Sequence, residues 1–139
     1  MITIRIAEPG EQAALQALQR RASHSPPDAD ELPLEQIAAG YVYVAVQDSV
    51  VVGFSSVLPR EDGDIDLDGL FVEPGRWRRR IGTSLVRDTI RRATLREGRW
   101  LHVIANPAAE AFYLACGFAF DGETQTRFGV ARTMRKPLT

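Results

Sequence analysis

The chain has 139 residues with a formal net charge of −1, and its 45% hydrophobic and 25% charged residues are ordinary for a globular protein. This length suits one core of two or three layers, so we expect a single domain over residues 1–139. A charge near zero argues against a global electrostatic grip on nucleic acid. The single cysteine, Cys116, excludes an intrachain disulfide framework and a cysteine-rich zinc site, and we expect no metal.

Apolar runs stay well short of the ~20 residues that a membrane span needs. The N-terminal residues MITIRIAEPGE have the pattern of a strand and lack the apolar core of a signal peptide. We therefore expect a cytoplasmic protein with neither membrane nor nucleic-acid partners.

The first forty residues predict one strand and two helices. Isoleucines at positions 2, 4 and 6 alternate with polar residues, which is the period of a half-buried strand. After Pro9-Gly10, a helix has one apolar face made of Ala14, Leu15, Leu18 and Ala22. The Pro-rich residues 23–33 form a loop, and a short second helix carrying Leu34, Ile37 and Ala38 ends at Gly40.

The middle of the chain predicts a β-meander followed by a long helix. Residues 41–46 and 50–58 are β-rich and are separated by a hairpin turn at 47–49. A tight turn at 61–64 precedes a third strand, Ile65–Val72. The helix begins near Ile81, and Gly98 is its expected C-terminal stop. Its apolar face contains Ile81, Leu85, Thr89, Ile90 and Ala93.

The last forty residues predict a strand at 100–105, a helix at 108–116 that ends at Gly117, and two strands at 118–126 and 131–136. The complete order is β-α-α-β-β-β-α-β-α-β-β. This order indicates an α/β fold with a mixed, mostly antiparallel central sheet and helices on both faces. Ligands of such sheets gather at the C-terminal ends of strands, here near Val72 and Asn106.

The junction between the third strand and the long helix is a candidate anion site. A helix N-terminus presents free backbone N–H groups and a partial positive charge. The same junction carries four arginines suited to phosphate oxygens: Arg76, Arg78, Arg79 and Arg80. We interpret the arginines farther along the helix as a solvated face. The junction therefore predicts a nucleotide-like cofactor.

These residues resemble the GCN5-related N-acetyltransferase (GNAT) family. Its central motif is Arg/Gln-x-x-Gly-x-Gly/Ala after a strand of the form Leu-x-Val-x-Pro. Residues 70–74, Leu-Phe-Val-Glu-Pro, match the strand, and residues 77–82, Trp-Arg-Arg-Arg-Ile-Gly, match the loop in spacing. Asn106, Ala109, Phe112-Tyr113 and Gly117-Phe118 match a later motif of the family.

The resemblance implies a GNAT fold and acetyl-CoA as cosubstrate. The implied cofactor-binding residues are Leu70, Phe71, Val72, Trp77, Arg78, Arg79, Arg80, Ile81, Gly82, Thr83, Asn106 and Tyr113. The Val72 N–H would polarise the acetyl carbonyl. Trp77 replaces the usual Arg or Gln, and Arg80 replaces the first Gly. Arginine can stand there only if its backbone keeps ordinary φ and ψ, so phosphate binding should depend on arginine side chains more than usual.

Tyr113 is the implied catalytic acid that protonates the departing CoA thiolate. Neighbouring residues of a helix point about 100° apart. We therefore expect Phe112 to be buried and Tyr113 to face the cofactor groove. Asn106 can cap the next helix and also contact the cofactor.

Three residues are candidates for the general base that deprotonates the acceptor ammonium: Asp68, His102 and Asp66. Asp66 and Asp68 share one strand face, and Gly69 beside them suits a β-bulge. A packed strand histidine is the other interpretation of His102.

The acceptor is expected to be a small-molecule primary amine, because the Asp-rich strand and the acidic residues around Glu31–Glu35 would attract a cation. His24 and Asp66 are the candidate substrate residues, and the loops 23–33 and 121–130 are the expected pocket. An acetyltransferase for protein or peptide N-termini and a non-catalytic acyl-CoA-binding module stay open as alternatives. A homodimer is possible, since β-edge dimers are common in the family.

Overall fold

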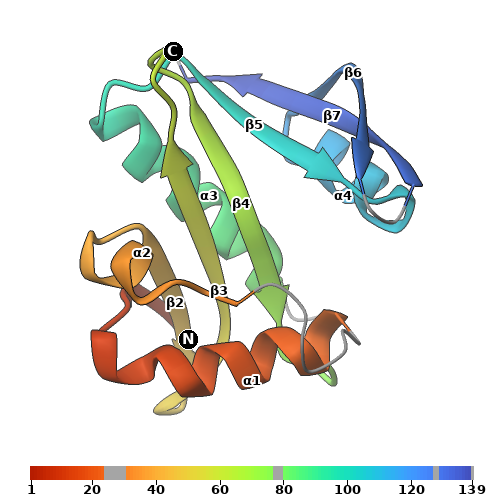
Figure 1. The fold of residues 1–139 in the computed structure, drawn as a ribbon. Helices are drawn as coiled ribbons and strands as arrows, with labels where there is room; N and C mark the ends of the chain where they lie inside the picture. Colours follow the sequence, from red (N-terminus) through yellow and green to blue (C-terminus); the bar gives the residue numbers. More distant parts are fainter. Residues whose placement is uncertain (24–30, 77–79, 127–128, 139) are drawn as a thin grey trace. The chain divides into compact units, whose positions relative to one another are not determined.

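The computed structural model describes residues 1–23, 31–76, 80–126 and 129–138 (Figure 1). Its elements follow the predicted order, with two short 3₁₀ turns added. They are β1 (Ile2–Ile6), η1 (Pro9–Glu11), α1 (Gln12–Ser23), α2 (Leu34–Ala38), β2 (Val42–Gln47), β3 (Val50–Pro59), β4 (Ile65–Val72), α3 (Ile81–Leu95), β5 (Trp100–Ala105), η2 (Pro107–Ala109), α4 (Glu110–Ala115), β6 (Ala119–Thr126) and β7 (Gly129–Pro137).

Within the described residues, seven strands form a sheet in the order β1-β2-β3-β4-β5-β7-β6. β4 and β5 pair in parallel, whereas the pairs β1–β2, β2–β3, β5–β7 and β6–β7 are antiparallel. The predicted mixed, mostly antiparallel α/β fold is therefore confirmed. None of the described helices is long and apolar enough to cross a membrane.

The chain divides into two compact units. The first contains Met1–Val57 and Gly69–Thr89, and the second contains Leu58–Asp68 and Ile90–Thr139. β3, β4 and α3 each contribute residues to both units.

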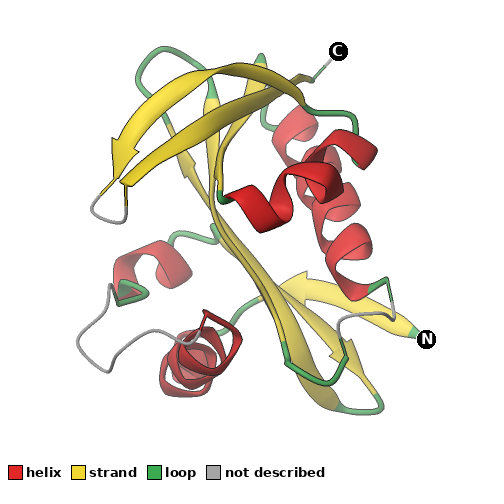
Figure 2. Ribbon diagram, turned by 90° about the vertical axis from the view of Figure 1, so that its right-hand side faces the viewer, coloured by secondary structure: helices red, strands yellow, loops and turns green. Residues whose placement is uncertain are grey.

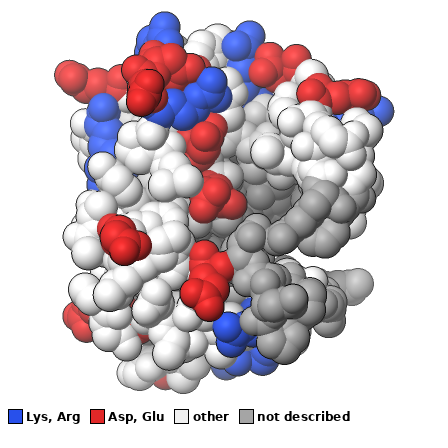
Figure 3. All heavy atoms as spheres, viewed as in Figure 1, with Lys and Arg blue, Asp and Glu red and all other residues white. Residues whose placement is uncertain are grey.

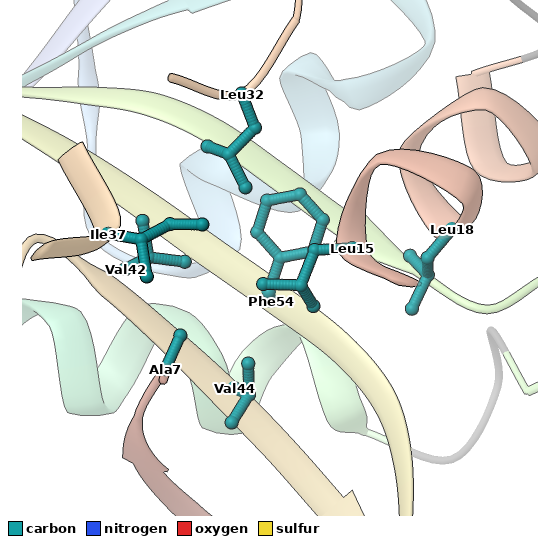
Figure 4. Close-up of a cluster of buried hydrophobic side chains, with 8 residues drawn as sticks. All are labelled: Ala7, Leu15, Leu18, Leu32, Ile37, Val42, Val44 and Phe54. Atoms are coloured by element: carbon teal, nitrogen blue, oxygen red, sulfur yellow. The ribbon is translucent and has the colours of Figure 1, made fainter. Parts of the chain in front are cut away.

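In the first unit, helices cover both faces of the strands. α1 and α2 lie on one side, and the first part of α3 lies on the other (Figure 2). On the α1 and α2 side, Phe54 is the largest member of a cluster of buried apolar side chains (Figure 4). The others are Ala7, Leu15, Leu18, Leu32, Ile37, Val42 and Val44. On the α3 side, Ala45 and Val52 pack with Ile81 and Leu85.

The β2–β3 hairpin confirms the turn predicted at residues 47–49. Gln47 pairs with Val50, which leaves Asp48 and Ser49 as a two-residue loop. Their φ angles are 52° and 65°. Positive φ at both positions is the geometry of a type I′ turn, whose twist matches that of the flanking strands.

In the second unit, β5 alternates between two environments. Leu101, Val103 and Ala105 are buried, whereas His102 is partly exposed and Ile104 is exposed. The α4 segment begins one residue before the predicted 108 as the 3₁₀ turn η2, and it continues as a short α-helix. Pro107 occupies the first turn, as predicted.

At the C-terminus of α3, the left-handed conformation does not lie at Gly98, the expected stop. The left-handed residue is Glu97, with a φ of 61°. The Glu97 N–H donates to the Thr94 carbonyl, and the Gly98 N–H donates to the Ala93 carbonyl, which together form a Schellman motif. Gly98 is small for another reason, because a Cβ there would lie 2.7 Å from the Ile65 side chain.

Three apolar positions that predicted the N-terminal helices are exposed. They are Ala14, Ala38 and Leu34, the last at 45%, whereas Leu32 from the Pro-rich segment is buried. The predicted α1 face is otherwise confirmed by Leu15 and Leu18. Short helices offer few turns for a periodic pattern, so single positions are easily misassigned.

Candidate active site

A cavity of about 390 Å³ lies within the second unit. Its lining residues are Arg60, Asp66, Leu67, Asp68, His102, Val103, Ile104, Asp121, Thr124 and Thr133. Three carboxylates, one guanidinium group, one imidazole and several aliphatic side chains therefore meet there. With His102 neutral, the charged lining residues carry a net negative charge.

Pairing between β4 and β5 brings the predicted base candidates together. Asp66 is the Cα partner of His102 in the parallel ladder. Along β4, Ile65 and Leu67 are buried, Asp66 is partly exposed and Asp68 is exposed. The prediction that both aspartates share one strand face is confirmed, and all three base candidates line the cavity.

His102 forms a short contact with a residue that the sequence analysis treated only as part of a turn. Its Nε2 lies 2.7 Å from Oδ2 of Asp64, and the Asp64 residue is 7% exposed. Arg99 Nη2 lies 3.3 Å from the other carboxylate oxygen, Oδ1. Spacing alone did not indicate this pair, because its members lie 38 positions apart.

Two of the cavity carboxylates, Asp66 and Asp121, have cationic neighbours. Arg60 contacts Asp62 at 2.8 Å and Asp66 at 3.5 Å. Arg135 lies 3.4 Å from Asp121 and also stacks over the Trp100 ring at 4.0 Å. The β3–β4 turn lies at the upper edge of Figure 3, where acidic and basic groups intermingle.

The predicted acceptor pocket needs correction at its second segment. Residues 119–126 are strand β6, not a loop, and Asp121 and Thr124 reach the cavity from that strand. The ladder between β6 and β7 is irregular between Phe120 and Gly122, at Asp121. Such an irregularity re-aims side chains at the point where it occurs. His24 lies outside the described residues.

The burial of Tyr113 and Phe112 is the reverse of the expectation. Tyr113 is buried at 7% exposure, and Phe112 is only partly buried. The Tyr113 ring packs edge-on against Phe118, with 5.5 Å between centroids. Burial raises the pKa of the Tyr113 phenol to about 12. The expectation that Phe112 is the buried member is wrong, because Gly117 allows Phe118 to fold back onto Tyr113.

Asn106 caps the segment that leads to α4. Its side-chain Oδ1 accepts a hydrogen bond from the Ala109 N–H at 3.0 Å. The predicted capping role is confirmed. Asn106 is exposed, so its contact with a cofactor stays a prediction.

In the first unit, α3 begins at the predicted junction. The Ser84 N–H donates to the Arg80 carbonyl, and Ile81, Gly82 and Thr83 form the first turn. Arg80 is exposed and has a φ of 60°. The expectation that arginine stands here only with ordinary φ and ψ is wrong, because the chain places it in the conformation that favours glycine. Trp77, Arg78 and Arg79 lie outside the described residues.

The end of β4 uses its side chains for packing. Leu70 and Val72 pack against the cluster on the α3 side, and Phe71 packs on the opposite cluster, 5.3 Å from the Phe54 ring. All three are partly buried. A ligand at this strand would therefore meet mainly main-chain groups.

Two charged residues of the β4–α3 loop are held by other elements of the first unit. Glu73 forms a two-point ion pair with Arg21 of α1, at 2.9 and 2.7 Å. The hydrogen bond from Arg21 holds the pKa of Glu73 below its usual value. Arg76 donates to the Gln47 side chain at 2.9 Å, so one of its nitrogens is already used.

Comparison with known families matches residues 12–118 to the acetyltransferase (GNAT) family. The chain belongs to this family. The predicted N-acetyltransferase class is thereby confirmed. The match includes β4, the first turn of α3, the β4–β5 pairing and Tyr113.

Solved GNAT structures share the complete fold of this chain. The ribosomal-protein-S18-alanine N-acetyltransferase of Escherichia coli is 22% identical, with a TM-score of 0.79 over 100% of this chain and 95% of that one. The PaiA N-acetyltransferase of Thermoplasma acidophilum, solved with coenzyme A, is 17% identical, with a TM-score of 0.82 over 99% of both chains. YncA of Salmonella typhimurium, solved with acetyl-CoA, is 19% identical, with a TM-score of 0.80 over 99% of this chain and 94% of that one. A search of curated proteins found no match.

Proposed function

We propose that this GNAT chain transfers an acetyl group from acetyl-CoA to a cationic primary amine, most favourably that of a small molecule. The observation that carries the acceptor class is the acidic cavity, where Asp66, Asp68 and Asp121 accompany His102. Aliphatic Leu67, Val103 and Ile104 line other parts of it. Carboxylates attract an ammonium group, while apolar walls suit the carbon chain of an amine.

The first turn of α3 fits the phosphates of acetyl-CoA. Ile81, Gly82 and Thr83 lie in that turn, where backbone N–H groups have no partner inside the helix. Exposed Arg80 adds a positive charge at the same end. Acetyl-CoA supplies the activated acetyl thioester. Family membership and the coenzyme complexes of PaiA and YncA support this assignment.

The acceptor arrives as an ammonium ion and must lose a proton before its nitrogen can attack. His102, Asp68 and Asp66 all line the cavity. His102 is the preferred base, because its imidazole is held by a buried carboxylate and one of its ring nitrogens can act as a proton acceptor. Asp66 lies 3.5 Å from Arg60, which favours a role in attracting the ammonium rather than in taking its proton.

Tyr113 is the proposed proton donor to the CoA sulfur. Its pKa of about 12 keeps the phenol protonated throughout the neutral range. A free thiol has a pKa of about 8.5, so complete transfer from Tyr113 to a thiolate is uphill. The Tyr113 hydroxyl would therefore act mainly as a hydrogen-bond donor that stabilises the developing thiolate.

The protons balance across the complete reaction. The ammonium gives one proton to the base, and the amine nitrogen gives a second as the amide forms. The C–S bond breaks as the C–N bond forms, and the sulfur leaves with one proton as the thiol. The products are the N-acetylated amine, free CoA and one proton released to solvent from the base.

The experiment assays the protein with acetyl-CoA against a panel of acceptors, which are primary amines and peptides with free N-termini. The readouts are thiol release and product mass. We expect thiol release to depend on a cationic small amine and to yield its N-acetyl product. Acetylation of peptides in preference to small amines would move the acceptor class to protein N-termini. Calorimetric binding of CoA without turnover on any amine would instead support a non-catalytic acyl-CoA-binding module.

A further inference from the structure

We propose that Asp64 is a positioning residue that holds His102 as the Nε2–H tautomer and leaves Nδ1 as the atom that takes the acceptor's proton. This inference rests on the proposed function and adds to it a residue that lies outside the family motif. The sequence analysis assigned Asp64 only to a turn. Its carboxylate is the group that makes a directed contact to the imidazole.

The contact fixes which ring nitrogen carries the proton. Asp64 Oδ2 and His102 Nε2 are 2.7 Å apart, which is a short hydrogen bond. An ionised carboxylate only accepts hydrogen bonds, so Nε2 must be the donor. A neutral imidazole has one N–H, and its other nitrogen is then a lone-pair acceptor. His102 lines the cavity proposed for the amine, and the proposal requires Nδ1 to face that cavity.

Asp64 is itself held rigidly by the backbone of the β3–β4 turn. The Arg60 N–H donates to the Asp64 carbonyl at 2.8 Å, and the Asp64 N–H donates to the Asp62 carboxylate at 2.9 Å. Arg99 Nη2 donates to the Asp62 carbonyl at 2.5 Å. These hydrogen bonds fix the position of the Asp64 carboxylate. A residue that orients another side chain must itself be held in this way.

The burial of Asp64 indicates a role beyond closing the turn. Its Oδ1 is buried without a hydrogen bond, and Arg99 Nη2 lies 3.3 Å away as an ion-pair partner. A buried carboxylate that is only partly satisfied is destabilising and calls for an explanation. An exposed aspartate would close the turn equally well, as Asp62 does nearby. Orientation of His102 supplies the explanation.

Other charged groups line the same cavity or pair with His102 in the sheet, but none of these groups replaces Asp64. Arg60 comes from the β3–β4 turn, Asp66 and Asp68 come from β4, and Asp121 comes from β6. Arg135 of β7 is the Cα partner of His102, yet its guanidinium lies over Trp100. In the described part of the chain, the Asp64 carboxylate is the recorded hydrogen-bond partner of the His102 ring.

The proton step follows from this geometry. The ammonium N–H bond breaks, its proton moves to Nδ1, and the electron pair stays on the amine nitrogen as the nucleophile. The resulting imidazolium keeps its Nε2–H bond to Asp64, whose negative charge stabilises it. Asp64 takes up no proton in this step. It touches neither the amine nor the thioester, and it acts through His102.

The direct test is ¹⁵N NMR of the imidazole rings in the free full-length protein. The chain has two histidines, His24 and His102, so the spectrum of His102→Gln assigns the signals. We expect the neutral wild-type His102 to show a protonated Nε2 and an unprotonated Nδ1. Asp64→Asn should mix the tautomers, whereas Glu61→Gln, in an exposed position of the same turn, should leave them unchanged. An Nδ1–H tautomer in the wild type would overturn the proposal.

The kinetic test is a double-mutant cycle. His102→Gln should lower kcat/KM by about 10²–10⁴-fold, and Asp64→Asn by about ten- to a hundredfold, as part of the contribution of the same base. In the His102→Gln background, Asp64→Asn should cause no further loss of kcat/KM, because both substitutions disable the same base. An equal loss in both backgrounds would make Asp64 merely structural and overturn the proposal.

The two tests separate this inference from the proposed function. A wild-type protein that acetylates no amine would overturn the proposed function and the catalytic use of the pair. The NMR measurement would still decide whether Asp64 sets the tautomer of His102. Retained folding of Asp64→Asn, checked by its unfolding midpoint, makes any loss of rate attributable to the imidazole.

Discussion

The two compact units use strand β4 in opposite ways. In the second unit, β4 begins with Ile65–Asp68, and its two aspartates open into the cavity. In the first unit, the same strand ends with Gly69–Val72, and its large side chains pack into the two apolar clusters. One strand therefore offers side-chain chemistry in its first half and main-chain groups in its second half.

The difference explains which positions can vary at little cost. If the cofactor is bound by main-chain groups, side chains need only keep the backbone in place, and we expect binding to tolerate Arg80 where the family has glycine, even though its φ of 60° favours glycine. In the cavity, we expect the carboxylates to decide which acceptor binds. We expect the first unit to respond to mutation mainly through stability and the second mainly through catalysis.

Of the changes predicted for the first unit, Phe71→Ala should have the largest effect. Phe71 packs against the Phe54 cluster while partly buried, so its removal should cost about 2–3 kcal/mol, slightly less than a fully buried phenylalanine. Urea denaturation would measure the loss. Asp68→Asn on the other half of the strand is the control and should change stability by less than ~0.5 kcal/mol. Equal losses in the two variants would erase the contrast between the halves.

The corresponding change in the second unit is Asp66→Asn combined with Asp68→Asn. Loss of two carboxylates from the cavity should raise KM for a cationic amine about ten- to a hundredfold, the value of one or two charged hydrogen bonds. KM for acetyl-CoA should not change. Asp48→Asn, in the β2–β3 turn of the first unit, removes a carboxylate that does not line the cavity, at a positive φ that asparagine tolerates, so it is the charge control. An unchanged KM for the amine would contradict the proposal that the cavity binds the acceptor.

Tyr113→Phe should lower kcat about tenfold, below the usual range for a general acid, because a phenol with a pKa of about 12 donates its proton reluctantly. The folded pKa lies above the ordinary 10.0, so the contribution of Tyr113 to stability is complete below pH 10 and is lost as pH rises through 12. Ultraviolet titration should show the ionisation of Tyr113 near pH 12, and the variant should lack this late step. Normal ionisation of all tyrosines would contradict the burial argument.

Arg80→Gly and Glu97→Gly form a matched pair at the two ends of α3. Both residues have left-handed φ, of 60° and 61°, so each glycine should stabilise the fold by about 0.5–1 kcal/mol. Only Arg80→Gly should also flatten the decline of CoA affinity with rising salt. Thermal unfolding and calorimetry at several salt concentrations measure both effects. The same salt dependence in both variants would mean that Arg80 does not contact phosphate.

The smallest effect should come from Arg21→Met. Arg21 is half exposed, so its ion pair with Glu73 is worth about 0.5 kcal/mol. The pKa of Glu73 is held below 4.5 by the Arg21 hydrogen bond. Its contribution to stability is therefore present above about pH 4.5 and disappears as pH falls through the lowered pKa. Wild type and variant should differ at pH 7 and converge near pH 2, as measured by urea unfolding.

The order of elements could be predicted because apolar periodicity and turn residues agree along most of the chain. β3 and β4, for example, each show a β-rich run closed by a polar turn. The left-handed backbones at Arg80 and Glu97 could not be predicted, because glycine is the usual signal for that conformation and neither position has it.

The candidate site was predicted in its chain positions but not in its pairing. Asp66, Asp68 and His102 came from strand parity, which a sequence reveals directly. Asp64 was missed, because its partner is set by the parallel register of β4 and β5 and not by local spacing. The burial of Tyr113 in place of Phe112 was missed, because it depends on how Phe118 folds back after α4.

The most direct measurement of the central claim is kcat/KM for acetyl transfer from acetyl-CoA to a primary amine, compared between wild type and the Asp66→Asn/Asp68→Asn variant. We predict saturable thiol release with an N-acetylated product in the wild type, and a loss in the variant that falls on KM for the amine alone. Absence of acetyl-CoA binding, or equal rates for the two proteins with every amine, would contradict the account.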